Sequence, residues 1–310
     1  CGVAYLGGTP AQGAIRNGKT SLYTCKGANV YAHELGHGIG LHHASTAPCN
    51  GKTYRAGLQG CDVVEYGNRF NTMGNGLGHF SAMQKATMGW LGGCNIRQVR
   101  RTGTFDLTAI QSAAHNSIAQ ALQIDTGDMR NGAPLYFYVE YRNPELATFN
   151  ATEQNGTRRE RGPGLHVSVS RDFRARGGEG RTILLDASEN LTGFPGNGAA
   201  NGDPRLTANR VFRPNERVAI ELLSRTESVA KVKVTITGGG GGANDACPNG
   251  VPTGEPEPEP EPAPVDAGSG DASAEADAAV IVDEGDGFHG GEAVDASTSE
   301  DAGMPPSAPE

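Results

Sequence analysis

Three histidines lie within an eleven-residue segment of this chain, at spacings that suit a single metal ion. His33 and His37 are four residues apart, so on a helix both imidazoles project from the same face. Gly40 permits the left-handed backbone with which a chain leaves a helix sharply, and His43 can then turn back as a third ligand. Three protein ligands with a fourth position left open are typical of catalytic Zn²⁺ sites.

Glu34 directly follows the first histidine, and we expect it to act as a base rather than to bind the metal. Its carboxylate would hold the attacking water and accept its proton. The segment then reads H-E-x-x-H-x-x-G-x-x-H with every fixed position filled. The alternative, a helix with buried and hydrogen-bonded histidines, leaves Glu34 and Gly40 unexplained. His42 has the wrong spacing for the metal, so we expect it to face solvent or to lie behind the ligands.

A methionine lies in a turn-rich segment some tens of residues after the third histidine. Asn71 and Gly74 supply the turn chemistry around Met73. Alone, Met73 would be interpreted as a core methionine, but beside the complete histidine segment it indicates the Met-turn of the metzincins.

The stretch from about residue 28 to residue 91 resembles one metzincin branch, the gametolysin family of zinc metalloproteases. The segments that carry the resemblance are residues 30–37 (VYAHELGH), 65–67 (EYG), 73–74 (MG), 79–82 (HFSA) and 89–91 (GWL). The chain departs from the pattern at Asn71, where many relatives have an acidic residue. It also has Asn75 where some metzincins place a tyrosine as an extra ligand, so no such ligand is expected.

This resemblance implies a secreted zinc endopeptidase that hydrolyses peptide bonds with metal-activated water. His33, His37 and His43 would hold Zn²⁺, Glu34 would be the general base, and Met73 would be a structural floor. The substrate would be a protein or peptide, possible examples being extracellular or cell-wall proteins. The competing hypothesis is a zinc-stabilised adhesive or binding module without proteolysis, and Glu34 disfavours it because a structural site needs no base.

Charge divides the chain into two unlike parts. The sequence has 26 basic and 35 acidic residues, and 17 of the acidic residues but none of the basic ones follow residue 244. The first 244 residues therefore carry a net charge of +8 and the rest −17. The Glu-Pro repeat and the Ala-, Asp- and Gly-rich end cannot bury enough apolar surface to fold.

The expected fold class is α+β with three parts. Residues 1–94 form the C-terminal part of a metzincin-like catalytic domain, residues 95–237 an antiparallel β-sandwich-like domain, and residues 238–310 a glycine hinge and disordered acidic tail. We expect the front of the catalytic domain to be missing, because only one or two strands fit before the histidine helix. No secretory leader or transmembrane run is seen.

Apolar periodicity predicts the individual elements. Asn29 is expected to cap a helix that runs to about Leu41, and residues 80–91 to form a second helix with Ser81 and Gln84 in a capping box. His79 is expected to be a structural cap of that helix. Residues 3–6 indicate a short strand, and residues 44–78 indicate loops and turns. Period-two alternation predicts strands at residues 104–107, 121–124, 135–141, 165–169, 217–222 and 230–236.

The chain has six cysteines, an even number that favours disulfides and a secreted or cell-surface location. Six cysteines allow 15 connectivities. We predict Cys49–Cys61, which would close the loop between the third histidine and Met73. Cys1–Cys25 and Cys94–Cys247 follow with less support, and free buried thiols remain the alternative.

The predicted partners are few. Seven arginines cluster in residues 158–181, but they lack interleaved aromatic residues, so solvated loops are favoured over nucleic-acid binding. We therefore expect no nucleic-acid partner, no membrane span and a monomer.

Overall fold

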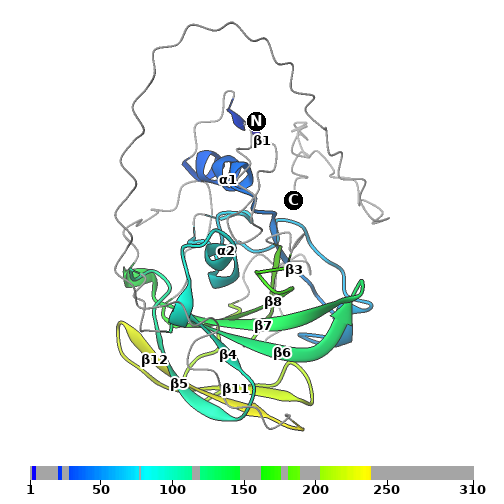
Figure 1. The fold of residues 1–310 in the computed structure, drawn as a ribbon, viewed down its shortest axis with the longest axis vertical. Helices are drawn as coiled ribbons and strands as arrows, with labels where there is room; N and C mark the ends of the chain where they lie inside the picture. The colour runs from blue at the N-terminus through cyan, green and yellow to red at the C-terminus, as the bar shows by residue number, and fades with distance from the viewer. Residues whose placement is uncertain are drawn as a thin grey trace, which may run out of the picture. The chain divides into compact units, whose positions relative to one another are not determined.

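The computed structural model describes residues 2–4, 20–22, 28–76, 78–113, 119–146, 162–175, 181–188 and 203–238 (Figure 1). The chain divides into two compact units, Cys1–Glu255 and Pro256–Glu310. The second unit, and with it nearly all of the predicted acidic tail, lies outside the described residues.

Two sheets contain nearly all of the described strands. The larger has the strand order β3-β9-β8-β7-β6-β4 and the smaller the order β10-β11-β12-β5. Strands of the larger sheet are β3 (Ala44–Thr46), β4 (Ile96–Val99), β6 (Ala121–Arg130), β7 (Ala133–Arg142), β8 (Gly164–Ser170) and β9 (Thr182–Leu184). Strands of the smaller sheet are β5 (Gly103–Thr108), β10 (Val211–Phe212), β11 (Val218–Arg225) and β12 (Val229–Ile236). A separate antiparallel pair joins β1 (Gly2–Ala4) to β2 (Thr20–Leu22).

The long strand β7 shows how the two sheets pack. Its alternate residues Leu135, Phe137, Val139 and Tyr141 are buried in one core with side chains of β5, β11 and β12. Tyr138 projects from the opposite face into a second core, which includes Met83 of the helix α2 (Ala82–Thr87). Since both faces of this sheet are covered, β7 is almost continuously buried.

All six strands predicted from alternation are present, but only the smaller sheet is wholly antiparallel, and the larger one is mixed. β3 pairs with β9, and β4 with β6, in parallel. The segment 44–78, predicted as loops and turns, contains β3, and this part of the prediction is wrong. β3 has three residues and pairs with β9, which lies far along the chain, so apolar alternation in the local sequence could not predict it.

Side chains from both sides of the predicted boundary at residue 94 share cores. Tyr54 and Leu58 pack in the same cluster as Phe137, and Met83 packs with Tyr138. The histidine segment is thus continuous in the structure with the two sheets, and one compact unit contains both.

The helices are shorter than predicted. α1 spans Ala28–Gly38 and already includes Asn29, so the predicted cap at Asn29 is wrong. α2 begins after Ser81, where the predicted capping box with Gln84 is confirmed, and it ends at Thr87 rather than near residue 91. Short 3₁₀ turns lie at η2 (Ala56–Leu58), η3 (Gly93–Asn95) and η4 (Pro144–Leu146).

The predicted disulfide Cys49–Cys61 is confirmed. Cys94 is also disulfide-bonded, but its predicted partner Cys247 lies outside the described residues, as do Cys1 and Cys25. Among the described helices, none combines the length and the apolar character that a membrane crossing requires.

Candidate metal centre

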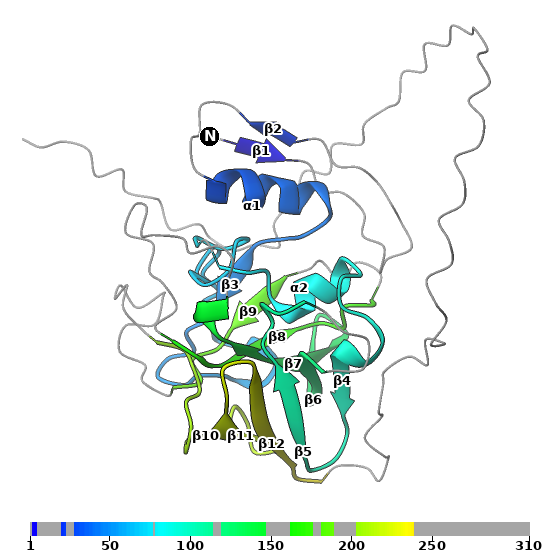
Figure 2. The same cartoon turned by 90° about the vertical axis from the view of Figure 1, so that its left-hand side faces the viewer.

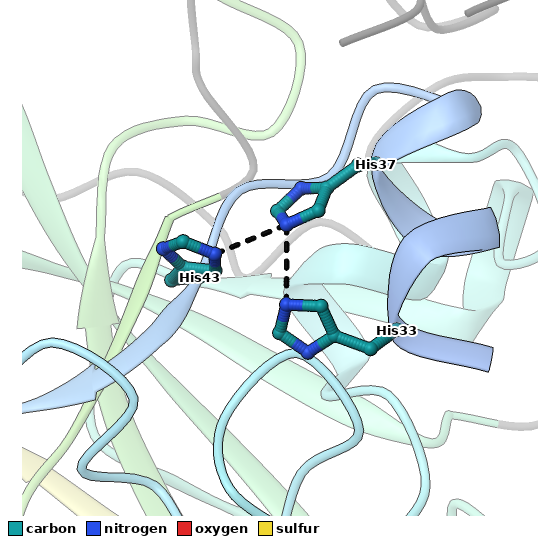
Figure 3. Close-up of side chains that lie close together, drawn as sticks. All are labelled: His33, His37 and His43. Atoms are coloured by element: carbon teal, nitrogen blue, oxygen red, sulfur yellow. Dashed lines mark hydrogen bonds between the residues drawn. The ribbon is translucent and has the colours of Figure 1, made fainter. Parts of the chain in front are cut away.

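The three histidines predicted from spacing converge on one point (Figure 3). His33 and His37 project from successive turns of α1, and His43 precedes the first residue of β3. The Nε2 atom of His37 lies 3.1 Å from that of His33 and 3.0 Å from that of His43. Among the described residues, this is the one cluster of three such groups suited to a metal ion.

Each histidine is oriented through its other ring nitrogen by a different part of the chain. Nδ1 of His33 donates to the Thr72 carbonyl oxygen over 2.8 Å, and Nδ1 of His37 to the Leu41 carbonyl oxygen over 2.6 Å. Nδ1 of His43 donates to the Glu65 carboxylate over 2.6 Å. Acceptors of this kind behind each imidazole are the usual outer partners of metal-binding histidines.

These partners fix which nitrogen carries the proton. Carbonyl and carboxylate oxygens accept, so each Nδ1 is protonated and each Nε2 presents a lone pair. The lone pair of His37 then lies about 3 Å from those of His33 and His43, and lone pairs at this separation repel one another unless a cation lies between them. Zn²⁺ with ligands at about 2.0–2.1 Å in tetrahedral geometry places neighbouring nitrogens about 3.3 Å apart. The observed 3.0 and 3.1 Å separations fit such an ion.

The surroundings favour the neutral form of His37 and His43. Burial lowers the pKa of His37 to about 4, an effect that the hydrogen bond to Leu41 opposes only in part. Burial also lowers the pKa of His43 against the opposing effect of Glu65. Neutral imidazole is the form that binds metal, so His37 and His43 are ready to bind near neutral pH.

The end of α1 aims the third ligand. Gly40 has a φ of +93°, and the amide of Leu41 donates to the Gly36 carbonyl while that of Gly40 donates to the His37 carbonyl. This pair of bonds is the Schellman motif, which needs a left-handed residue at the position of Gly40. The chain therefore turns at the predicted glycine and brings His43 towards the helix.

Met73 lies under α1, as expected for a structural floor. It is fully buried, and its sulfur is so close to Gly36 that a Cβ atom there would come within 2.3 Å. The amide of Met73 donates to Oδ1 of Asn71, whose Nδ2 donates to Gln84 of α2. Asn71 thus does more than replace an acidic residue, since its amide links the Met-turn to the second helix.

Two neighbouring residues at the site were quoted only as part of the resemblance, with no role predicted. Glu65 holds His43, and the ring of Tyr66 lies 3.8 Å from the ring of His43 and 5.7 Å from that of His33, centroid to centroid. Burial, and then Glu65 and Glu34, raise the pKa of Tyr66 above its ordinary value. The available signal for Glu65 was its place in the segment 65–67 that carries the resemblance.

Two other histidines considered in the sequence, His42 and His79, lie outside the three-histidine cluster. His42 is half-buried outside the three-histidine cluster, and its carbonyl oxygen accepts from Gln84. His79 lies before α2, but the predicted cap at His79 is wrong, because the N-cap of the helix is Ser81. Nε2 of His79 is buried without a hydrogen-bond partner.

A buried ion pair on β7 anchors the Met-turn loop. Arg142 and Glu140 lie side by side and are almost fully buried. The guanidinium of Arg142 donates to the carbonyl oxygens of Phe70 and His79, which bracket the loop containing Met73. Sequence reasoning missed this anchor, because Arg142 and Phe70 lie 72 residues apart.

Comparison with known proteins returned no matching family model, curated protein or solved structure.

Proposed function

We propose that this protein is a zinc-dependent endopeptidase with the metzincin-like site predicted from its sequence. One observation carries the proposal: three imidazoles converge, each held by an acceptor behind it, with Nε2 of His37 3.1 Å from that of His33 and 3.0 Å from that of His43. Glu34 follows His33 directly on α1 and supplies a carboxylate. Its charge contributes to raising the pKa of Tyr66, whose ring lies against that of His43.

Bound Zn²⁺ would polarise the scissile carbonyl and make water a better nucleophile near neutral pH. His33, His37 and His43 hold the ion through Nε2, while Thr72, Leu41 and Glu65 keep their rings aimed. The carboxylate of Glu34 takes the proton from the attacking water and delivers it to the nitrogen of the leaving amine. Met73 supports α1 from below without binding the ion.

The same proposal includes the location and the substrate class. A secreted or cell-surface enzyme suits the disulfide Cys49–Cys61 and the bonded state of Cys94, since disulfides persist in oxidising compartments. The substrates would be proteins or peptides outside the cell, including cell-wall proteins, and the protein would act as a monomer.

A second candidate is a binding module in which the metal only stabilises the fold. One observation favours it: two of the histidines come from α1 and the third directly precedes β3, so an ion would fasten the helix to the large sheet. The role of Glu34 separates the two candidates, because a fastening ion needs no neighbouring base.

The experiment uses the full chain loaded with zinc after chelator treatment. Wild type should degrade azocasein and a fluorogenic peptide library, and chelator should abolish both activities. Glu34→Gln should keep stoichiometric zinc but lose at least roughly 10²–10⁴-fold in kcat, the usual contribution of a general base. Glu145→Gln, which neutralises an exposed carboxylate elsewhere, is the matched control. Near-normal turnover by Glu34→Gln would refute the mechanism, and zinc binding without any turnover would favour the binding module.

A further inference from the structure

Tyr66 combines an exposed ring with contact to the metal ligands. Its side chain lies against His43 and His33, yet the residue remains 42% exposed. The ring planes of Tyr66 and His33 differ by 23°, so the phenol stacks over the ligands rather than pointing away from them. One face of the ring is therefore used by the ligands, and apolar surface beside the candidate centre remains accessible.

The backbone at Tyr66 is in a conformation that tyrosine disfavours. The amide of Gly67 donates to the carbonyl of Val64 over 3.1 Å, which closes a turn with Tyr66 at its third position. Tyr66 has a φ of +59°, a value for which glycine or asparagine is the usual choice at that position. The glycine instead lies one residue later, where a Cβ atom would come within 2.2 Å of Oγ1 of Thr46.

The other described non-glycine residues with positive φ have ordinary explanations. Three are asparagines, which tolerate this conformation, namely Asn50, Asn131 and Asn209. The fourth, Leu58, is only 5% exposed and packs in the main core, so burial offsets its strain. Tyr66 has neither explanation, and strained residues of this kind concentrate at sites where proteins bind ligands.

Holding His43 in place does not explain Tyr66 either. Glu65 already fixes that imidazole through a 2.6 Å hydrogen bond to Nδ1. Glycine or asparagine at position 66 would relax the turn without removing the carboxylate that accepts this bond. The aromatic ring thus has a use that ligand orientation alone does not require.

We propose that Tyr66 is a specificity-determining residue, whose free ring face packs against an apolar side chain of the bound peptide next to the scissile bond. This inference rests on the proposed peptidase function, because it takes a peptide to be what approaches the metal. The contact is made by the ring and not by the hydroxyl, so phenylalanine should replace tyrosine without loss of preference.

The test compares peptide pairs that differ only by Leu or Asn at one position, scanned over the residues on either side of the cleaved bond. At one position wild type should favour Leu, and Tyr66→Ala should reduce the Leu/Asn ratio of kcat/KM by roughly 2- to 12-fold, the range of aromatic packing contributions. Most of the change should be in KM. Tyr66→Phe should keep the ratio within about twofold of wild type, as should Tyr31→Ala, which removes another exposed tyrosine from α1.

A second measurement does not depend on hydrolysis. Peptidyl hydroxamates carrying the same Leu or Asn would be titrated into the zinc-loaded full chain by calorimetry. Tyr66→Ala should narrow the difference in Kd between the two, while leaving the zinc content and the visible spectrum of the cobalt-substituted protein unchanged.

The outcomes separate the inference from the function on which it rests. Hydrolysis with a Leu/Asn ratio that Tyr66→Ala does not alter would refute the role of Tyr66 and leave the peptidase proposal standing. Hydroxamate selectivity that depends on Tyr66, in a protein that cleaves nothing, would support a peptide contact and refute the peptidase. Loss of the preference in Tyr66→Phe would refute the ring-packing contact, and failure to bind either hydroxamate would overturn both proposals.

Discussion

The sulfur of Met73 touches the backbone of the helix at Gly36, with room for no side chain between them. A β-carbon added to Gly36 would lie 2.3 Å from Sδ and 3.2 Å from Cε of Met73. Since Gly36 lies between the ligands His33 and His37, this contact sets the height of α1 above the Met-turn. Packing thus fixes the ligand positions from below, while hydrogen bonds fix their rotation.

Gly36→Ala is therefore predicted to be destabilising and to weaken metal binding. Overpacking of this kind typically costs about 1–3 kcal/mol, and the displaced helix should reduce zinc affinity. Chemical denaturation and chelator competition would measure the two effects. Met73→Ala should rescue part of the loss in the double variant. Gly92→Ala is the control, because a β-carbon there meets nothing within 4 Å; equal effects of the two alanines would contradict the contact.

Removing the carboxylate behind His43 is predicted to lower metal affinity. Glu65→Leu leaves Nδ1 of His43 without its acceptor, and loss of such outer partners typically reduces affinity by about 10–100-fold. Glu65→Gln keeps an oxygen acceptor and should lose less. Competition with a chromophoric chelator would give the affinities, with Asp62→Asn as a control at an exposed acidic residue nearby. Unchanged zinc affinity in Glu65→Leu would show that His43 needs no such partner.

The buried imidazole of His166 is predicted to make the fold sensitive to acid. Burial, and then Arg142 and Arg205, hold the pKa of His166 well below its ordinary 6.5. Below about pH 6.5 the unfolded chain therefore binds a proton that the folded chain does not, so stability falls as pH falls and is retained above that value. His79, with a pKa lowered to about 4 by burial, acts in the same direction between pH 6.5 and 4.

His166→Gln should flatten this dependence, because glutamine does not titrate. Thermal unfolding would be followed from pH 8 to pH 5 in the presence of chelator, so that metal loss does not enter. As the pH falls across this range, the Tm of wild type should decrease by more than the Tm of His166→Gln. A constant difference would mean that His166 does not titrate on unfolding.

Breaking the ion pair on β7 is predicted to affect both stability and the site. Arg142→Met leaves Glu140 buried without its partner, a change that typically costs about 3–5 kcal/mol. It also frees the carbonyls of Phe70 and His79, so zinc affinity should fall. The double variant Glu140→Gln/Arg142→Met should be less destabilised than the two single changes combined. Denaturation and chelator competition would show this, and full additivity would argue against direct coupling.

The convergence of the three histidines could be predicted from the sequence because their geometry is local. His33 and His37 share a helix face, Gly40 ends the helix, and His43 follows within three residues. The same is true of Cys49–Cys61, which closes a short loop, and of the capping box at Ser81. Each depends on backbone geometry over one or two turns.

What sequence reasoning missed depends on contacts between distant residues. Arg142 bonds the loop that contains Met73 from β7. Apolar alternation predicted that β7 is a strand, but it did not predict which residues β7 contacts. β3 and β9 have three residues each and become strands by pairing with each other and with their neighbours. The strained turn at Tyr66 has no local signature, because nothing in the residue types places a positive φ on tyrosine rather than on the following glycine.

The division of the ligands between α1 and β3 has a consequence for local opening of the fold. α1 contacts the short pair β1 and β2, whereas β3 is the edge strand of the large sheet (Figure 2). Without metal, we expect α1 to unfold locally at a lower free energy than global unfolding, because the core between the sheets contains no side chain of α1. Amide hydrogen exchange in α1 should then slow on adding zinc, while the protected amides of β7 exchange at an unchanged rate.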